Sequence, residues 1–247
     1  MAKTTNMQEL KKLAKSFLHF EPEPTEYAPV IIHHPFTTSG LVALKQPDGS
    51  QGIGNILEDP KDLQAWREQQ EIIIDQMKTP LQLAFRITNP YAFGFLKFAQ
   101  PYLSRDDMSE VLSYMWIHTE APNRDPNLSK AKLVSMFQAA NPAVMMDEEE
   151  YLQFKMLDDN LTVYRGVTSL NADNIKALSW TLDRDKAFWF AHRFGENGTV
   201  YEAQISKEHV YAYFSGRGES EVIVDPKHLT DITQVEEQSQ GFTMAMQ

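Results

Sequence analysis

The spacing of apolar positions divides the chain into a helical first part and a second part rich in strands. Over residues 7–20, apolar side chains recur every three or four positions, which predicts an amphipathic helix that ends at Glu21-Pro22-Glu23-Pro24. The same spacing predicts further helices over 62–77, 80–98, 108–118 and 129–139. Residues 30–57 have the pattern of short strands and turns, with a hairpin turn at Pro47-Asp48-Gly49. We therefore expect a mainly helical lobe with a β-rich start over residues 1–150.

From residue 161 onward, the pattern is that of strands around one helix. β-branched and aromatic side chains predict strands over 161–167 and 177–181. Asp183 is a suitable N-cap for a helix over 184–194, where apolar side chains again have helical spacing. More strands are predicted over 198–205, 210–214 and 221–224. The expected fold class is α+β, with a second domain over residues 151–247.

Three short motifs in the second domain point to chemistry. They are Tyr164-Arg165-Gly166, Ser179-Trp180-Thr181 and Glu219-Ser220-Glu221. The arginine offers a rigid charged fork for a phosphate, the two hydroxyls share one strand face, and the two glutamates share another because strand side chains repeat every second residue. Each motif alone is more typical of a surface cation, a polar strand face or charges on an edge strand. Their order, spacing and strand context together favour a nucleotide site.

This set of residues resembles the Arg–Ser–Glu class of mono-ADP-ribosyltransferases, enzymes that transfer ADP-ribose from NAD to a protein or nucleic acid. The resemblance covers residues 161–225 and implies an ADP-ribosyltransferase-like mixed β core with NAD as the substrate. The catalytic residues that it implies are Arg165, Ser179, Glu219 and Glu221. In this family the second glutamate holds the ribose 2′-hydroxyl and stabilises the oxocarbenium-like sugar, while the first orients or deprotonates the acceptor.

The resemblance also implies which strand residues bind NAD. Arg165, with the adjoining Gly166, matches the first-strand arginine that contacts the NAD phosphates. Ser179 and Thr181 match the first and last positions of the family's Ser-Thr-Ser motif. Trp180 and Thr181 depart from that motif, but threonine keeps the hydroxyl and the middle side chain points to the other face of the strand.

The helix after the second strand supplies further NAD contacts in this resemblance. Phe190 is the first choice to stack on nicotinamide, and Phe188 is its rival. Arg193, almost one turn later, is placed to reach a phosphate. Aromatic side chains on a helix are also typical of core packing, so a purely structural role for these rings is the alternative.

Composition restricts the partners of the 247-residue chain. It contains no cysteine, which excludes disulfide bridges, a thiolate nucleophile and a cysteine zinc site. A formal net charge of −11 gives no general attraction for a polyanion, so the charge favours a protein acceptor over RNA. In toxins of the family that the chain resembles, a glutamate at the first position of the Glu-x-Glu pair commonly accompanies transfer to arginine. This makes an arginine side chain our leading candidate for the acceptor. No apolar run resembles a membrane span or a signal peptide, so we expect a cytoplasmic protein without a membrane partner.

Two histidine-bearing stretches do not predict a metal site. The spacing of His118, Glu120 and Asp125 matches no established metal-binding motif, and a polar loop explains these residues better. The same holds for His33-His34, which lies beside a proline. We expect no bound metal.

The segment 116–123 resembles proteins of bacteria and their phages that carry this transferase core behind a helical part. That resemblance implies a role in phage–host conflict, as a toxin of a toxin–antitoxin or antiphage system or as a phage effector, with an antitoxin or inhibitor protein as a partner. Two alternatives keep the same site. One is an NAD glycohydrolase without a macromolecular acceptor. The other is a non-catalytic binding protein of the same fold, against which the intact Glu221 argues.

Overall fold

The computed structural model describes residues 3–45, 48–195, 197–216 and 218–236. The chain folds as two compact units. The first consists of Met1–Ser129 with Ala139–Met145, and the second of Lys130–Gln138 with Met146–Gln247. The predicted boundary at residue 150 lies close to Met146, but no change in composition announces that residues 130–138 belong with the second unit.

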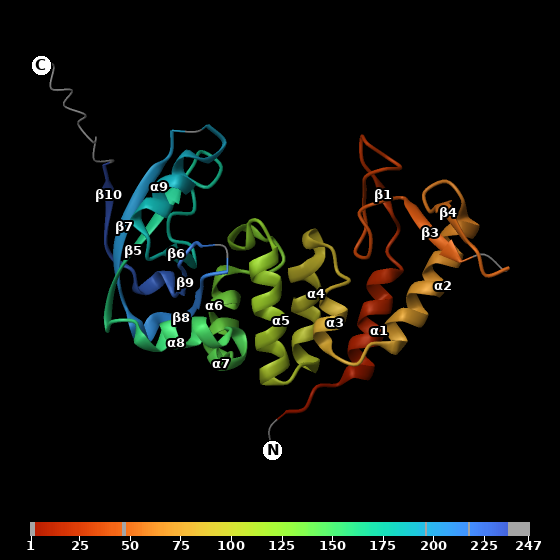
Figure 1. The fold of residues 1–247 in the computed structure, drawn as a ribbon, viewed down its shortest axis with the longest axis horizontal. Helices are drawn as coiled ribbons and strands as arrows, with labels where there is room; N and C mark the ends of the chain where they lie inside the picture. The colour runs from red at the N-terminus through yellow and green to blue at the C-terminus, as the bar shows by residue number, and fades with distance from the viewer. Residues whose placement is uncertain (1–2, 46–47, 196, 217, 237–247) are drawn as a thin grey trace, which may run out of the picture. The chain divides into compact units, whose positions relative to one another are not determined.

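The first unit is mainly helical, with small two-stranded sheets near its start (Figure 1). Its helices are α1 (Met7–Leu18), α2 (Pro60–Gln76), α3 (Pro80–Ala84), α4 (Ala92–Ala99), α5 (Arg105–His118) and α7 (Pro142–Met145), with 3-10 turns η1 (Asn89–Tyr91), η2 (Gln100–Tyr102) and η3 (Pro122–Arg124). Its antiparallel strand pairs are β1 (Glu23–Pro24) with β2 (Ile32–His33) and β3 (Leu41–Lys45) with β4 (Gln51–Asn55). The helical lobe with a β-rich start that the pattern predicts is therefore present.

The single helix predicted over residues 80–98 is wrong. α3 ends at Ala84, and α4 begins only at Ala92, after the η1 turn. Pro90 has no N–H for a helical hydrogen bond and disfavours helical geometry in the residue before it, so a continuous helix is excluded here. The predicted hairpin turn includes Pro47, which lies outside the described residues; Gly49 in the same turn has a φ of 86°.

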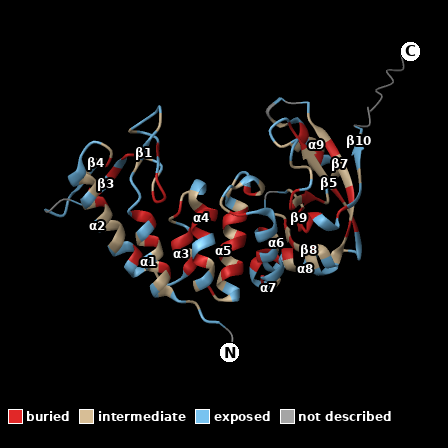
Figure 2. Cartoon of the chain, turned by 180° about the vertical axis from the view of Figure 1, so that it is seen from behind, coloured by how far each residue is buried: buried red, intermediate tan, exposed pale blue. Residues whose placement is uncertain are grey.

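The core of the first unit lies where α1, α3, α4 and α5 pack together. Figure 2 shows buried residues gathered on α4 and α5. The large side chains that are fully buried there include Phe93, Phe95, Leu112, Met115 and Trp116. These residues exclude water on the faces that the helical periodicity predicts.

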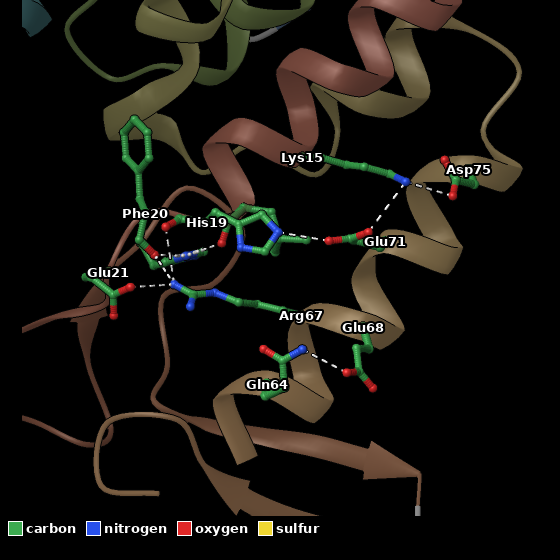
Figure 3. A network of polar contacts seen from close by, with 11 residues as sticks. Lys15, His19, Phe20, Glu21, Gln64, Arg67, Glu68, Glu71 and Asp75 are labelled. Atoms are coloured by element: carbon green, nitrogen blue, oxygen red, sulfur yellow. Dashed lines mark hydrogen bonds and ion pairs between the residues drawn. The ribbon is translucent and has the colours of Figure 1, made fainter. Parts of the chain in front are cut away.

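Polar contacts join α1 to α2 at the edge of this core (Figure 3). Lys15 Nζ lies 2.8 Å from Asp75 Oδ2, and His19 Nε2 lies 2.8 Å from Glu71 Oε1. Arg67 Nη2 donates to the carbonyl oxygen of Phe20 at 2.8 Å. These contacts hold the end of α1 beside α2.

His34 is a buried structural residue close to this network. It is 1% exposed, its Nδ1 accepts a hydrogen bond from the Phe36 amide at 3.1 Å, and its Nε2 donates to the carbonyls of Leu18 and Phe20 at 3.2 and 3.1 Å. Burial lowers the pKa of His34 to about 4, although the two carbonyls act in the opposite direction. The imidazole is therefore neutral at neutral pH and serves packing.

The second unit is built on one antiparallel sheet with the strand order β10-β7-β5-β6-β9-β8. Its strands are β5 (Asn160–Val167), β6 (Ser179–Thr181), β7 (Thr199–Ser206), β8 (Val210–Phe214), β9 (Glu221–Val224) and β10 (Thr230–Val235). Its helices are α8 (Glu148–Met156) and α9 (Arg184–His192), most of α6 (Lys130–Ala139), and the 3-10 turns η4 (Arg193–Gly195), η5 (Lys207–His209) and η6 (Pro226–His228). The chain is thus a mixed α and β protein, compatible with the α+β class.

Helices pack against this sheet, and its apolar side chains form the core of the second unit. α9 lies on β5 and β7, while α8 contacts β8. The core includes Val163, Trp180, Ala203 and Val222, all 2% exposed or less. Among the described residues, no helix combines the length and the apolar character needed to cross a membrane.

Candidate functional site

β6 places the Ser179 hydroxyl against the Glu221 carboxylate. In the antiparallel pairing of β6 with β9, Thr181 lies opposite Glu221 and Ser179 lies opposite Ile223, so Ser179 and Glu221 are diagonal neighbours on one sheet face. Ser179 Oγ donates a hydrogen bond to Glu221 Oε1 at 2.5 Å. Glu221 is only 7% exposed. The sheet therefore holds a buried carboxylate in a fixed orientation.

Arg165 on β5 completes this group. Its Nη1 donates to the carbonyl oxygen of Ser179 at 2.6 Å, and its Nε is buried without a hydrogen-bond partner among the described residues. Burial lowers the pKa of Arg165 to about 10, the Glu221 carboxylate raises it, and Arg193 lowers it. The guanidinium stays charged at neutral pH, and a buried donor without a partner is typical of a position where a ligand oxygen binds.

Gly166, beside Arg165, lets α9 approach the sheet directly. A Cβ atom at Gly166 would lie 2.1 Å from the Ala187 carbonyl oxygen and 2.6 Å from the Ala191 amide nitrogen. Only glycine fits such a contact. The geometry therefore explains Gly166 by helix packing, whereas the resemblance implies that it takes part in NAD binding.

The packing of α9 gives the two candidate stacking rings, Phe188 and Phe190, different surroundings. Phe188 packs against Ala187, Ala191 and Val200, and the Arg184 guanidinium lies 4.7 Å from the centre of its ring. Its ring is therefore part of the packing. Phe190 is half-buried and its Cβ lies next to Gly166. Of the two rings, Phe190 is thus the one close to the arginine motif.

Arg193 follows directly after α9 and extends over Phe190. Its guanidinium carbon lies 5.3 Å from the centre of the Phe190 ring, within the range of a cation–π contact. Its charge is close enough to Arg165 to lower the pKa of that residue. The structure therefore brings Arg165, Phe190 and Arg193 close to one another.

Thr181 supports the glutamate turn from β6. Thr181 is 5% exposed, and its Oγ1 donates a hydrogen bond to the Glu219 carbonyl oxygen at 2.6 Å. Thr181 Oγ1 also accepts a hydrogen bond from the Asp183 amide at 3.0 Å. The Leu182 amide also donates to the Ser220 carbonyl oxygen at 3.0 Å. This hydroxyl holds the backbone of residues 219–220, a role distinct from the NAD contact that the resemblance implies.

The expectation that Glu219 and Glu221 share one face of an extended segment is wrong. β9 begins at Glu221, and Ser220 has a left-handed φ of 43°. A left-handed residue reverses the local course of the backbone, so side chains no longer alternate as in a strand. Glu219 is half-buried on the turn, while Glu221 is inside the sheet. The two carboxylates therefore belong to different environments.

Lys130, at the start of α6, contacts the loop that leads into β6, and the sequence analysis did not single it out. Its Nζ donates to Asn174 Oδ1 at 2.8 Å and also to the carbonyl oxygen of Lys176. Both partners lie in the connection between β5 and β6, just before Ser179. No motif surrounds Lys130, so no local pattern marks it.

The described residues contain no group of three or more histidine and acidic side chains arranged to hold a metal ion. No protein-family model matches the chain, and the searches of curated proteins and of solved structures also find no match. The site must therefore be interpreted from its own geometry.

Proposed function

We propose that the chain is a mono-ADP-ribosyltransferase that uses NAD, with an ADP-ribosyltransferase-like core in its second unit. The observation that carries this proposal is the hydrogen bond from Ser179 to the buried Glu221, beside the bond from Arg165 to the Ser179 carbonyl. These three residues lie far apart in the sequence. Their convergence supplies an anion-binding cation and an oriented carboxylate at one place.

The reaction needs both groups. When the bond between the ribose C1′ and the nicotinamide nitrogen breaks, nicotinamide leaves with the electron pair and the sugar becomes an oxocarbenium-like cation. In our proposal Glu221 stabilises this cation, because a carboxylate fixed by Ser179 requires no reorientation as the charge develops. Arg165 binds the diphosphate, Phe190 stacks on nicotinamide, and an acceptor nucleophile then attacks C1′ and loses its proton.

Glu219 is proposed to face the acceptor. It lies on a turn that Thr181 and Leu182 hold by backbone contacts, outside the strand that carries Glu221. A half-buried carboxylate there is placed to orient or deprotonate a nucleophile. We propose an arginine side chain as the acceptor, and a cytoplasmic role as a toxin or effector in phage–host conflict, restrained by an antitoxin or inhibitor protein.

The decisive variant is Glu221→Gln. The amide keeps the shape and a hydrogen-bonding oxygen but cannot balance the ribosyl cation, so we expect nicotinamide release to fall at least about 10²-fold. Release is measured with NAD labelled in the nicotinamide ring, and circular dichroism verifies the fold. A folded Glu221→Gln protein that releases nicotinamide at the wild-type rate would refute the assignment.

A second variant, Glu219→Ala, separates transfer from hydrolysis. Because Glu219 is proposed to serve the acceptor alone, we expect loss of most acceptor labelling while slow nicotinamide release to water continues. The assay uses adenylate-labelled NAD with a whole-cell lysate, followed by protease or nuclease treatment. Equal loss of both activities contradicts this division of roles, and wild-type cleavage that labels no acceptor identifies an NAD glycohydrolase.

A further inference from the structure

The amine of Lys130 lies at the edge of the proposed site but comes from a different part of the chain. α6 precedes the sheet, and Lys130 lies outside the stretch 161–225 that carries the family resemblance. Two of its three N–H donors are used by Asn174 Oδ1, at 2.8 Å, and by the Lys176 carbonyl. Lys130 is exposed, and among the described residues its third donor has no partner of this kind, so this donor faces solvent.

Charge accumulates around this amine in an otherwise acidic protein. Burial and the nearby Arg165 guanidinium lower the pKa of Lys130, and Arg193 acts in the same direction on Arg165. Arg165 therefore lies within electrostatic reach of both Lys130 and Arg193, and Glu221 is the carboxylate that acts on Arg165. Glu221 offsets part of the repulsion between these like charges, and a bound anion would offset more of it.

We propose that Lys130 is a third cation of the anion site, which together with Arg165 and Arg193 binds the diphosphate of a nucleotide. The buried Nε of Arg165 and the third donor of Lys130 are the groups that the ligand oxygens contact. Lys176 is followed after two residues by Ser179, whose carbonyl binds Arg165, so the short connection links the two cations. This proposal rests on the proposed function but assigns a binding residue that the resemblance does not include.

The test measures inorganic pyrophosphate binding to the full chain by calorimetry at low salt. Lys130→Met removes the charge and keeps much of the length, and we expect affinity to fall about tenfold or more. Lys130→Arg keeps the charge and should stay within about threefold of wild type. Lys132→Met, on the same helix, is the matched control and should change affinity by less than about twofold.

Each outcome has a defined meaning. If the wild type and Lys130→Met bind pyrophosphate equally, or if the wild type binds none, the three-cation site is refuted. If binding depends on Lys130 but the wild type releases no nicotinamide from NAD, the anion site stands and the proposed transferase activity fails. Should Lys130→Met fail to fold, Lys130→Gln takes its place: a loss of affinity of about tenfold supports the contact, and an affinity within about twofold of wild type refutes it.

Discussion

At the scale of single residues, the site depends on hydroxyl groups that position carboxylates. Ser179 bonds to the Glu221 side chain, whereas Thr181 bonds to the Glu219 backbone. The two residues come from one motif and lie on one strand, yet Ser179 fixes a carboxylate on β9 and Thr181 fixes the turn that precedes β9. Their substitution should therefore have different consequences.

We expect Ser179→Ala to lower kcat for nicotinamide release by about 10- to 100-fold, with a much smaller change in KM for NAD. The alanine leaves Glu221 without the hydroxyl that fixes it, so the loss concerns a group that acts in the transition state. Steady-state kinetics at several NAD concentrations separates the two constants. Thr181→Ser, which keeps its hydroxyl, is the control, and a Ser179→Ala protein with unchanged kcat would remove this hydrogen bond from the mechanism.

At the scale of elements, much of the second unit could be predicted from local patterns. The strands at residues 160–167, 210–214 and 221–224 have the β-branched and aromatic residues that the sequence analysis used. α8 and β10 were not predicted. Most of β10 is polar and exposed, so no apolar alternation marks it as an edge strand.

The parts of the site that escaped prediction share one physical cause. Lys130 acts through tertiary contacts with Asn174 and Lys176, which lie more than forty residues away in the sequence. Ser220 adopts a left-handed conformation that serine rarely takes, so strand periodicity was applied across a turn. The sequence places Gly166 in an NAD motif, whereas the structure shows that α9 packs directly against it. Local pattern cannot report such contacts.

The packing of α9 on β5 provides a stability test. We expect Gly166→Ala to lower the free energy of unfolding by at least about 2 kcal/mol, because its Cβ would overlap the backbone of Ala187 and Ala191. Gly216→Ala is the matched control, since a Cβ there meets nothing within 4 Å. Urea unfolding followed by circular dichroism measures both. Similar stability of the two variants would contradict the close approach.

At the scale of the whole molecule, each unit has its own core, and the titratable side chains buried in the two units have different roles. His34 in the first unit is buried for packing: its ring nitrogens bond to backbone groups, and its ring lies against Trp66. Arg165 in the second unit is buried with a donor that lacks a partner among the described residues. A buried polar group that is satisfied supports stability, and the unsatisfied donor of Arg165 leaves a position that a ligand oxygen can fill.

The stability of the first unit should depend on pH through His34. The pKa of His34 in the folded protein, about 4, lies below the ordinary value of 6.5. Between these two pH values, the unfolded chain therefore binds a proton at His34 and the folded chain does not. The contribution of His34 to the free energy of unfolding is fully present above pH 6.5. It is lost as pH falls toward 4, by up to about 3 kcal/mol. Urea unfolding at a series of pH values measures it, and His34→Gln should lose this dependence.

Two controls make that prediction specific. His33→Gln changes the exposed neighbouring histidine and should retain the wild-type pH dependence. An NMR titration of the imidazole resonances should show one histidine with a pKa of about 4. A His34 that titrates near 6.5 would show that the ring is open to water in the folded protein.

The contact of α9 with the sheet also bears on how this protein can change during evolution. Gly198 repeats what Gly166 does: its Cβ would lie 2.3 Å from both the Ala191 and the Val167 carbonyl oxygens. The helix that carries Phe190 is therefore positioned largely by main chain against main chain, with little side-chain volume between them. Any side chain at these two glycines would push the proposed ligand-facing helix away from the sheet, so we expect both positions to stay glycine as the sequence diverges.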